Sequence, residues 1–127
     1  MNRRFWTAGA PMLLAAAISI AACSRAIDDN RGGNFTGEAL LDVRTRQIER
    51  AAHGLGWQTD VVGPGMIRAT LNLRTHVAVT DIGYDTTRFT IRYADSRNLR
   101  TEDGGIHRNY NAWTRNLERA IIQQPVP

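Results

Sequence analysis

Asp95, Ser96 and His107 are residue types that together catalyse hydrolysis in many enzymes. A histidine that takes the serine proton, oriented by a carboxylate, would turn the hydroxyl into a nucleophile. The surrounding stretch, ADSRNLRTEDGGIH, has no GxSxG turn, and adjacent Asp and Ser residues are common in turns. Hydrogen bonds within a loop, without any catalytic role, account well for Asp95, Ser96 and Asn98. We therefore predict no catalytic residue and keep a hydrolase as an alternative.

The three histidines do not form a metal-binding motif. His53 falls near the C-terminal end of an expected helix, where a cation interacts favourably with the helix dipole. His76 and His107 are far apart in the sequence, and neither is at a ligand spacing from a second histidine or a cysteine. The stretch GPGMIRA lacks the lysine and the following helix of a phosphate loop. We predict no metal ion and no cofactor.

Two groups of polar residues are candidates for a ligand or partner surface. The first is rich in hydrogen-bond donors and could hold an anionic or glycan-like ligand; its members are Asp95, Ser96, Asn98, His107, Arg108 and Asn111. The second is a basic face on the uncovered side of a sheet, made by Arg68, Arg88 and Arg92, which could meet anionic lipid or an acidic partner. The alternatives are a loop bonded to its own scaffold and a solvated sheet face.

The single cysteine, Cys23, ends the apolar leader MNRRFWTAGAPMLLAAAISIAAC. The leader has a basic start and an apolar run that is short for a membrane span. Its last four residues, Ile20 to Cys23, resemble the bacterial lipobox, in which a peptidase cuts before a cysteine that carries a diacylglyceryl group. We expect residues 1–22 to be a lipoprotein signal peptide and Cys23 to be lipidated. The alternatives are an ordinary cleaved signal and a buried apolar helix.

These expectations place the chain on a bacterial membrane, facing the periplasm. Ser24 stands where an aspartate typically retains lipoproteins at the inner membrane, so we favour the outer membrane. All 16 basic residues are arginine, against 12 acidic residues, and two of the arginines lie in the leader. The mature chain is therefore only slightly basic, which does not point to a nucleic acid partner.

The mature chain reads as a tether followed by one domain. Residues 23–37 are polar and glycine-rich, which predicts a flexible tether, and residues 38–127 form the domain. Apolar spacing predicts a helix from Thr45, its N-cap, to Gly54 or Gly56, and another over 109–122. Alternation predicts strands over 57–62, 66–73, 76–84 and 88–93. The expected fold is α+β, a two-layer sandwich in which a four-stranded antiparallel meander is flanked by the two helices, in the order α-β-β-β-β-α. The stretch EALLDV before the first helix is either an edge strand or a helix lead-in.

Four segments carry a family resemblance. They are GW at 56–57, IRATLNLRTHVAVTDIGYD at 67–85, FTIRYADSRNL at 89–99 and IHRNYNAWTRNLERAI at 106–121. Together they resemble a group of small bacterial envelope lipoproteins of uncharacterised function, and IHRNYNAWTRNL is the most specific part. The resemblance implies an envelope lipoprotein with a single α+β domain, and it implies no activity or ligand.

The leading functional hypothesis is a non-enzymatic binding or assembly module, anchored to the membrane through Cys23, with an envelope protein or glycan as partner. A small envelope hydrolase acting on peptidoglycan or lipid is one alternative. A periplasmic small-ligand sensor is another, and it requires an apolar pocket between the two layers.

Overall fold

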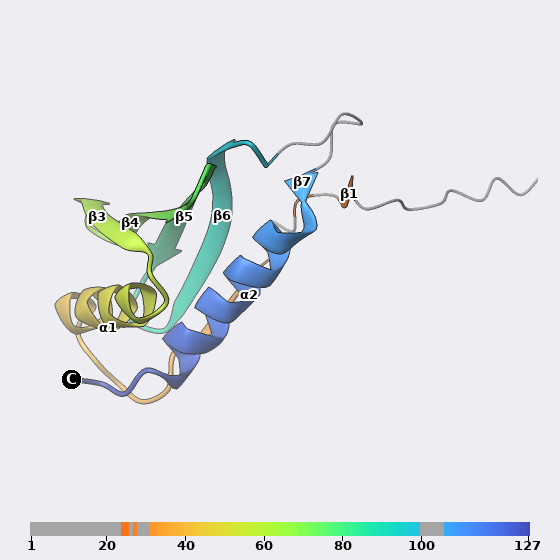
Figure 1. Ribbon diagram of the computed structural model, residues 1–127. Helices are drawn as coiled ribbons and strands as arrows, with labels where there is room; N and C mark the ends of the chain where they lie inside the picture. The colour runs from red at the N-terminus through yellow and green to blue at the C-terminus, as the bar shows by residue number, and fades with distance from the viewer. Residues whose placement is uncertain (1–23, 26, 28–30, 100–105) are drawn as a thin grey trace, which may run out of the picture.

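The computed structural model describes residues 24–25, 27, 31–99 and 106–127 (Figure 1). Within them the chain forms two helices, α1 (Leu41–Gly54) and α2 (Arg108–Gln123). The strands are β1 (Ser24–Arg25), β2 (Arg31–Asn34), β3 (Gln58–Gly63), β4 (Met66–Leu73), β5 (His76–Tyr84), β6 (Arg88–Arg97) and β7 (Ile106–His107). The fold is therefore α+β, as the sequence predicts.

Five strands make one antiparallel sheet in the order β2-β6-β5-β4-β3. The strands from β3 to β6 follow one another as the predicted meander, and β5 has the predicted bounds. At the β3–β4 turn Gly65 has φ +74, and a Cβ there would lie 2.7 Å from the carbonyl oxygen of Tyr84. The turn therefore requires glycine. A separate two-stranded pair joins β1 to β7, with Ser24 opposite His107.

The predicted four-stranded sheet is wrong by one strand. β2 lies in the segment expected to be a flexible tether, and it pairs with β6 from Arg31↔Ile91 to Asn34↔Arg88. The order of the main sheet and helices is thus β-α-β-β-β-β-α. A Cβ at Gly32 would collide with the carbonyl oxygen of Phe89, so β2 approaches β6 closely at this residue. A four-residue strand with two central glycines has no apolar alternation by which the sequence could reveal it.

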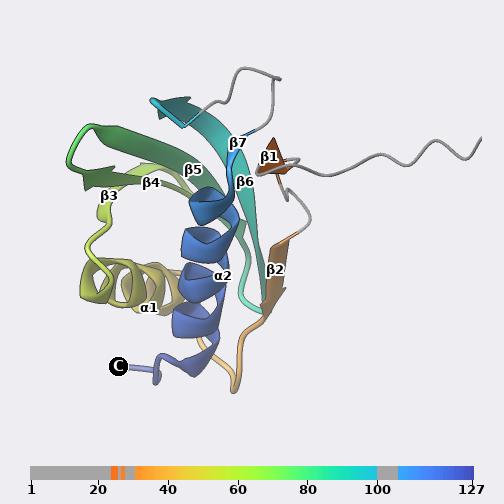
Figure 2. The same cartoon turned by 45° about the vertical axis from the view of Figure 1, so that its right-hand side comes forward.

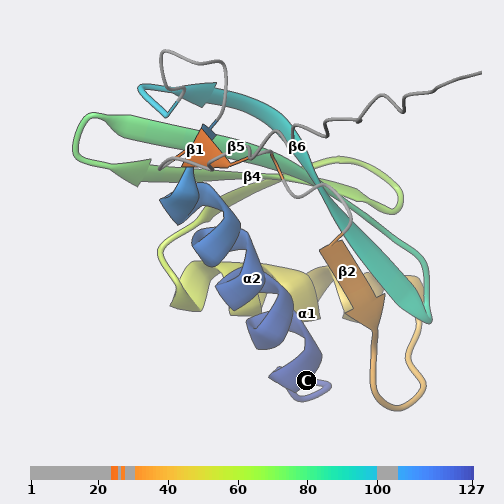
Figure 3. The same cartoon turned by 90° about the vertical axis from the view of Figure 1, so that its right-hand side faces the viewer.

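Both helices cover the same face of the sheet, and Figures 2 and 3 show them together on one side of the strands. The buried core lies between these layers. The sheet contributes Ile67, Ala69, Leu71, Ala78, Ile82, Phe89 and Ile91, and the helices contribute Ile48, Ala51, Ala52, Tyr110, Leu117 and Ile121. The buried residues of β4 and β6 alternate along each strand as predicted, except that Leu73, expected to point inward at the end of β4, is exposed.

The predicted N-cap of the first helix is wrong. α1 begins at Leu41, four residues before Thr45, so EALLDV is a helix lead-in, and Leu40 at the N-cap makes no side-chain capping bond. The Thr45 hydroxyl lies 3.1 Å from the Leu41 carbonyl oxygen and 2.5 Å from the hydroxyl of Tyr84 on β5. Thr45 therefore joins the helix to the sheet.

Candidate functional site

Exposed apolar side chains gather on the β3–β4 hairpin, residues 58–73. Of the seven large apolar side chains that are exposed among the described residues, four lie on this hairpin: Val61, Val62, Met66 and Leu73. Leu55, a fifth, is in the turn that leads into β3. β3 is the last strand of the sheet, and among the described residues only β4 pairs with it. The hairpin thus combines an open sheet edge with exposed apolar side chains at both of its ends: Val61, Val62 and Met66 lie beside the turn, and Leu73 lies at the far end of β4.

The outer face of the sheet carries a row of alternating charges rather than a basic patch. Asp60 on β3 is opposite Arg68 on β4, Arg68 is opposite Asp81 on β5, and Asp81 is opposite Arg92 on β6. The Arg68 guanidinium donates to both oxygens of Asp81, from Nε at 2.8 Å and from Nη2 at 3.1 Å. The predicted basic face is therefore wrong, because Asp81 on β5 lies between Arg68 and Arg92, and Asp60 on β3 lies beyond Arg68 at the open edge.

Asp81 accepts hydrogen bonds from Arg68 through both of its carboxylate oxygens. Its hydrogen bond and its charge, with smaller contributions from Asp60 and Asp95, raise the pKa of Arg68 above the ordinary value. At the open edge, Asp60 is exposed, and no hydrogen bond or ion pair joins its carboxylate to another described residue. Asp60 acts on Arg68 only through its charge.

Arg88, the third member of the predicted basic face, begins β6 after the tight turn at Asp85. The Asp85 carboxylate accepts the backbone N–H groups of Thr87 and Arg88 at 2.7 and 2.8 Å. These backbone bonds, the Thr87 hydroxyl and the charge of Arg88 lower the pKa of Asp85. This arrangement is an Asx-type turn that sets the β5–β6 connection.

Asp95 and Ser96 lie in β6, not in a loop as expected, and their side chains point to opposite faces of the sheet. Asp95 is opposite Val79 on the outer face, and Ser96 is opposite the buried Ala78. The Ser96 hydroxyl lies 2.8 Å from the Tyr93 hydroxyl, and Asp95 accepts the backbone N–H of Ser96. Strand alternation therefore separates the serine from the carboxylate of the hypothetical triad.

Asn98 and His76 connect the end of β6 to the β4–β5 turn. Asn98 has φ +60, and its side-chain amide donates to the carbonyl oxygen of Thr75 at 2.7 Å. A ring nitrogen of His76, Nδ1, lies 2.7 Å from the carbonyl oxygen of Asn98. These bonds give both residues a structural role. At the end of α1, His53 Nε2 similarly lies 2.8 Å from the Thr59 hydroxyl on β3.

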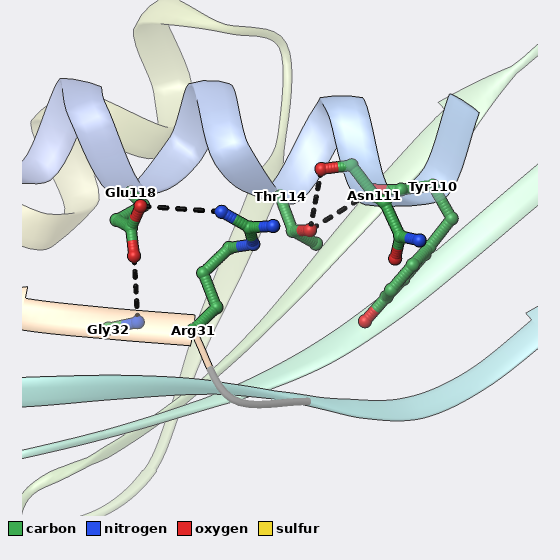
Figure 4. A network of polar contacts seen from close by, with 6 residues as sticks. All are labelled: Arg31, Gly32, Tyr110, Asn111, Thr114 and Glu118. Atoms are coloured by element: carbon green, nitrogen blue, oxygen red, sulfur yellow. Dashed lines mark hydrogen bonds and ion pairs between the residues drawn. The ribbon is translucent and has the colours of Figure 1, made fainter. Parts of the chain in front are cut away.

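His107 and Arg108 are described only as backbone, at the end of β7 and the start of α2, so their predicted roles lie outside the described side chains. Asn111 is in the first turn of α2, and its carbonyl oxygen accepts the Thr114 hydroxyl at 3.2 Å (Figure 4). Cys23 precedes the described residues.

The side of α2 that faces β2 holds a polar contact shown in Figure 4. Glu118 accepts the backbone N–H of Gly32 at 2.9 Å and lies 3.4 Å from Arg31 Nη1. The side chains of Arg31 and Glu118 are 13% and 21% exposed. The partial burial strengthens this ion pair relative to a surface pair. This contact holds β2 against α2, while strand pairing holds β2 against β6.

An apolar cleft opens between the layers beside the first residues of β3. It has a volume of about 230 Å³ and is lined by Leu55, Trp57, Leu71, Leu73, Trp113 and Asn116. Trp57 is almost fully buried and forms the deep part, whereas Leu55 and Leu73 are exposed at the rim. Asn116 supplies an amide that could orient a ligand.

Arg44 is the main polar residue that the sequence analysis missed. It is fully buried on α1, with its guanidinium 4.5 Å from the centre of the Phe35 ring. Its nitrogens donate to the carbonyl oxygens of Thr36, Gly37 and Thr86 and to the side chain of Gln47. One signal was available, because Arg44 precedes Ile48 by one helical turn and so shares the apolar face.

Gln47 extends this cluster to the C-terminal end of the chain. It is also fully buried, and its side-chain amide donates to the carbonyl oxygen of Gln124 at 2.6 Å. Arg44 and Gln47 thus connect α1 to the segment after β2, to the β5–β6 turn and to the end of α2. They have the contacts of a structural cluster rather than of a site open to ligands.

Across the described parts of the chain, no three His, Cys, Asp or Glu side chains gather where they could hold a metal ion. Neither of the two described helices is long and apolar enough to cross a membrane. Comparison with family models, curated proteins and solved structures gives no match for this chain.

Proposed function

We propose that this chain is a lipoprotein of the bacterial envelope that acts as a non-enzymatic binding or assembly module. The lipobox pattern from Ile20 to Cys23 supports attachment to a membrane through acyl chains on Cys23. Two or more acyl chains give a stable anchor, because each buried methylene contributes about 0.8 kcal/mol. Ser24 favours the outer membrane, with the domain facing the periplasm.

The observation that carries the binding role is the exposed apolar surface of the β3–β4 hairpin. Val61 is 47% exposed and Val62 is 51% exposed, on a strand whose second edge is open among the described residues. Apolar side chains on an open edge are a liability for aggregation unless a partner covers them. We infer that the hairpin is the surface through which the module binds an envelope partner.

Anchoring is tested by mass spectrometry of the mature N-terminus and by fractionation of cells. We expect a mature chain that begins at an acylated Cys23 and sediments with membranes. The Cys23→Ser variant should lose the acyl chains and leave the membrane fraction. An unmodified Cys23, or a Cys23→Ser variant that still sediments with membranes, would contradict the anchor.

The binding surface is tested by photocrosslinking in intact cells. A photoreactive residue at Val62 should give a discrete adduct with an envelope protein, and one at Thr90 should not. Thr90 is a suitable control because it is also exposed on a strand, but on β6, away from the open edge. Equal adducts from both positions, or none from Val62, would contradict a role for the hairpin.

The apolar cleft supports a second candidate function, the small-ligand sensor. Five of its six lining residues are apolar, and its volume of about 230 Å³ suits an uncharged ligand smaller than most drugs. The uncharged dye N-phenyl-1-naphthylamine should quench Trp57 and Trp113 if it enters the cleft. Leu73→Arg should abolish the quenching by blocking the rim, whereas Arg74→Leu should not. Quenching that Leu73→Arg leaves unchanged would place the dye elsewhere.

A further inference from the structure

The open edge of β3 presents one charge to an incoming chain, the carboxylate of Asp60. It lies at the end of the alternating row, next to Arg68, whose Nε and Nη2 both donate to Asp81. An extended segment that adds to the sheet beside β3 would place one of its own side chains opposite Asp60. Continuing the alternation requires that side chain to be basic.

The flanking positions define the rest of the segment. Thr59 and Val61 point to the face that the helices cover, because they are opposite the buried Ala69 and Ile67. A strand beside β3 would therefore place its residues on either side of the cation against Thr59 and Val61. Those residues are expected to be apolar and β-branched, since such residues favour strands and would cover the exposed Val61.

A second copy of the chain fits this edge poorly. Two β3 strands that paired antiparallel with Asp60 opposite Asp60 would bring the two carboxylates close together, and like charges opposite each other destabilise a strand pair. An acidic residue on an edge strand is also a common way to prevent such self-pairing. The same carboxylate attracts a basic partner strand.

We propose that β3 binds an extended segment of a partner protein as a sixth strand, with a lysine or arginine of that segment opposite Asp60 and β-branched apolar residues beside it. This inference rests on the proposed binding role of the hairpin and specifies the partner at that surface. Backbone hydrogen bonds along Gln58–Val61, before the irregularity between Val61 and Gly63, would supply the affinity, and Asp60 would supply the charge preference.

The test uses the full chain in detergent micelles and two probe peptides of seven residues. One peptide has arginine at its centre, a valine on each side, then threonine and serine; the other has glutamate at the centre. Amide NMR shifts and hydrogen exchange are measured during titration. We expect shifts and slower exchange over Gln58–Gly63, and about three- to tenfold tighter binding of the arginine peptide. The preference should weaken as salt is added.

Asp60→Lys should reverse the preference, so that the glutamate peptide binds more tightly. Asp42→Lys is the matched control, because Asp42 is an exposed acid on α1, away from the edge, and this change should leave the preference unaltered. If the β3 amides are protected from hydrogen exchange but both peptides bind with equal affinity, the proposed preference for a basic residue opposite Asp60 is wrong, and the proposed binding role of the hairpin still stands. Shifts located away from β3, or a chain that dimerises through β3, would also overturn the inference. The binding role itself fails separately, through the absence of adducts at Val62.

Discussion

Replacing the buried Arg44 with methionine should strongly destabilise the fold. Four hydrogen bonds join its guanidinium to three separate parts of the chain. A hydrogen bond to a charged group contributes about 1.5–3 kcal/mol, but the freed carbonyl groups of Thr36, Gly37 and Thr86 are near the surface and can regain water. Counting about 1 kcal/mol for each bond gives an expected loss of about 3–4 kcal/mol for Arg44→Met.

Equilibrium urea unfolding, followed by the fluorescence of the buried Trp57, measures this loss. For a domain of this size the urea m-value is about 1.5–2 kcal/mol per molar, so the midpoint should fall by about 2 M. Arg44→Lys should lose nearly as much, because one ammonium group cannot reach acceptors in three directions. Arg46→Met is the matched control, since Arg46 makes an exposed ion pair with Asp42 that contributes about 0.5 kcal/mol at most.

Two results would refute this account of Arg44. One is a loss below about 1 kcal/mol in the free energy of unfolding for Arg44→Met. That result would mean that the desolvation cost of the buried guanidinium is about as large as the stabilisation from its hydrogen bonds. The other is full stability of Arg44→Lys, which would mean that charge, rather than the shape of the guanidinium, holds the cluster together.

Three further predictions concern stability. Thr80→Val should stabilise the domain by about 1 kcal/mol in urea unfolding, because the Thr80 hydroxyl is fully buried without a partner among the described residues; a loss of stability would indicate a missed hydrogen bond. Gly65→Ala should lower the free energy of unfolding by about 1–2 kcal/mol, because φ is positive there and a Cβ would meet the carbonyl oxygen of Tyr84. Gly54→Ala should be neutral or slightly stabilising, because a Cβ there meets no other atom. Equal effects of the two variants would contradict the turn geometry. Asp85 has a lowered pKa in the fold, so its stabilising effect should be complete above about pH 5 and be lost as the pH falls through the folded pKa. A carboxyl NMR titration that places Asp85 at or above the ordinary aspartate value would contradict this, and Asp85→Asn should remove this part of the acid dependence.

Elements with an uninterrupted apolar period were predictable from the sequence. Alternation through Ile67, Ala69 and Leu71 identified β4, and helical spacing identified α2 to within a residue at each end. β6 was predicted too short, because a bulge near Tyr93 places Asp95, not Ala94, opposite Val79 and breaks the alternation. A pattern method cannot follow a strand through such a shift.

The candidate site was predictable only in part, because it depends on strand register. Arg68 and Arg92 were correctly placed on the outward side of their strands, but the sequence alone did not show which residues lie between them. Once the strands are aligned, Asp81 falls between the two arginines and the expected basic face becomes a neutralised row. The open edge at Asp60 follows from the same alignment, since it depends on β3 being the last strand.

The pairing of β1 with β7 has a consequence for how an anchored domain would sit above a bilayer. Ser24 immediately follows Cys23 and lies opposite His107, so acyl chains on the cysteine would join the body at the start of α2. The flexible tether expected for residues 23–37 would then not separate the anchor from the domain, because Ser24 is already paired with β7. The domain would therefore adopt a narrower range of orientations relative to the bilayer. β1 and β3 lie at opposite ends of the molecule in Figure 1, so that attachment would leave the apolar hairpin pointing away from the lipid headgroups.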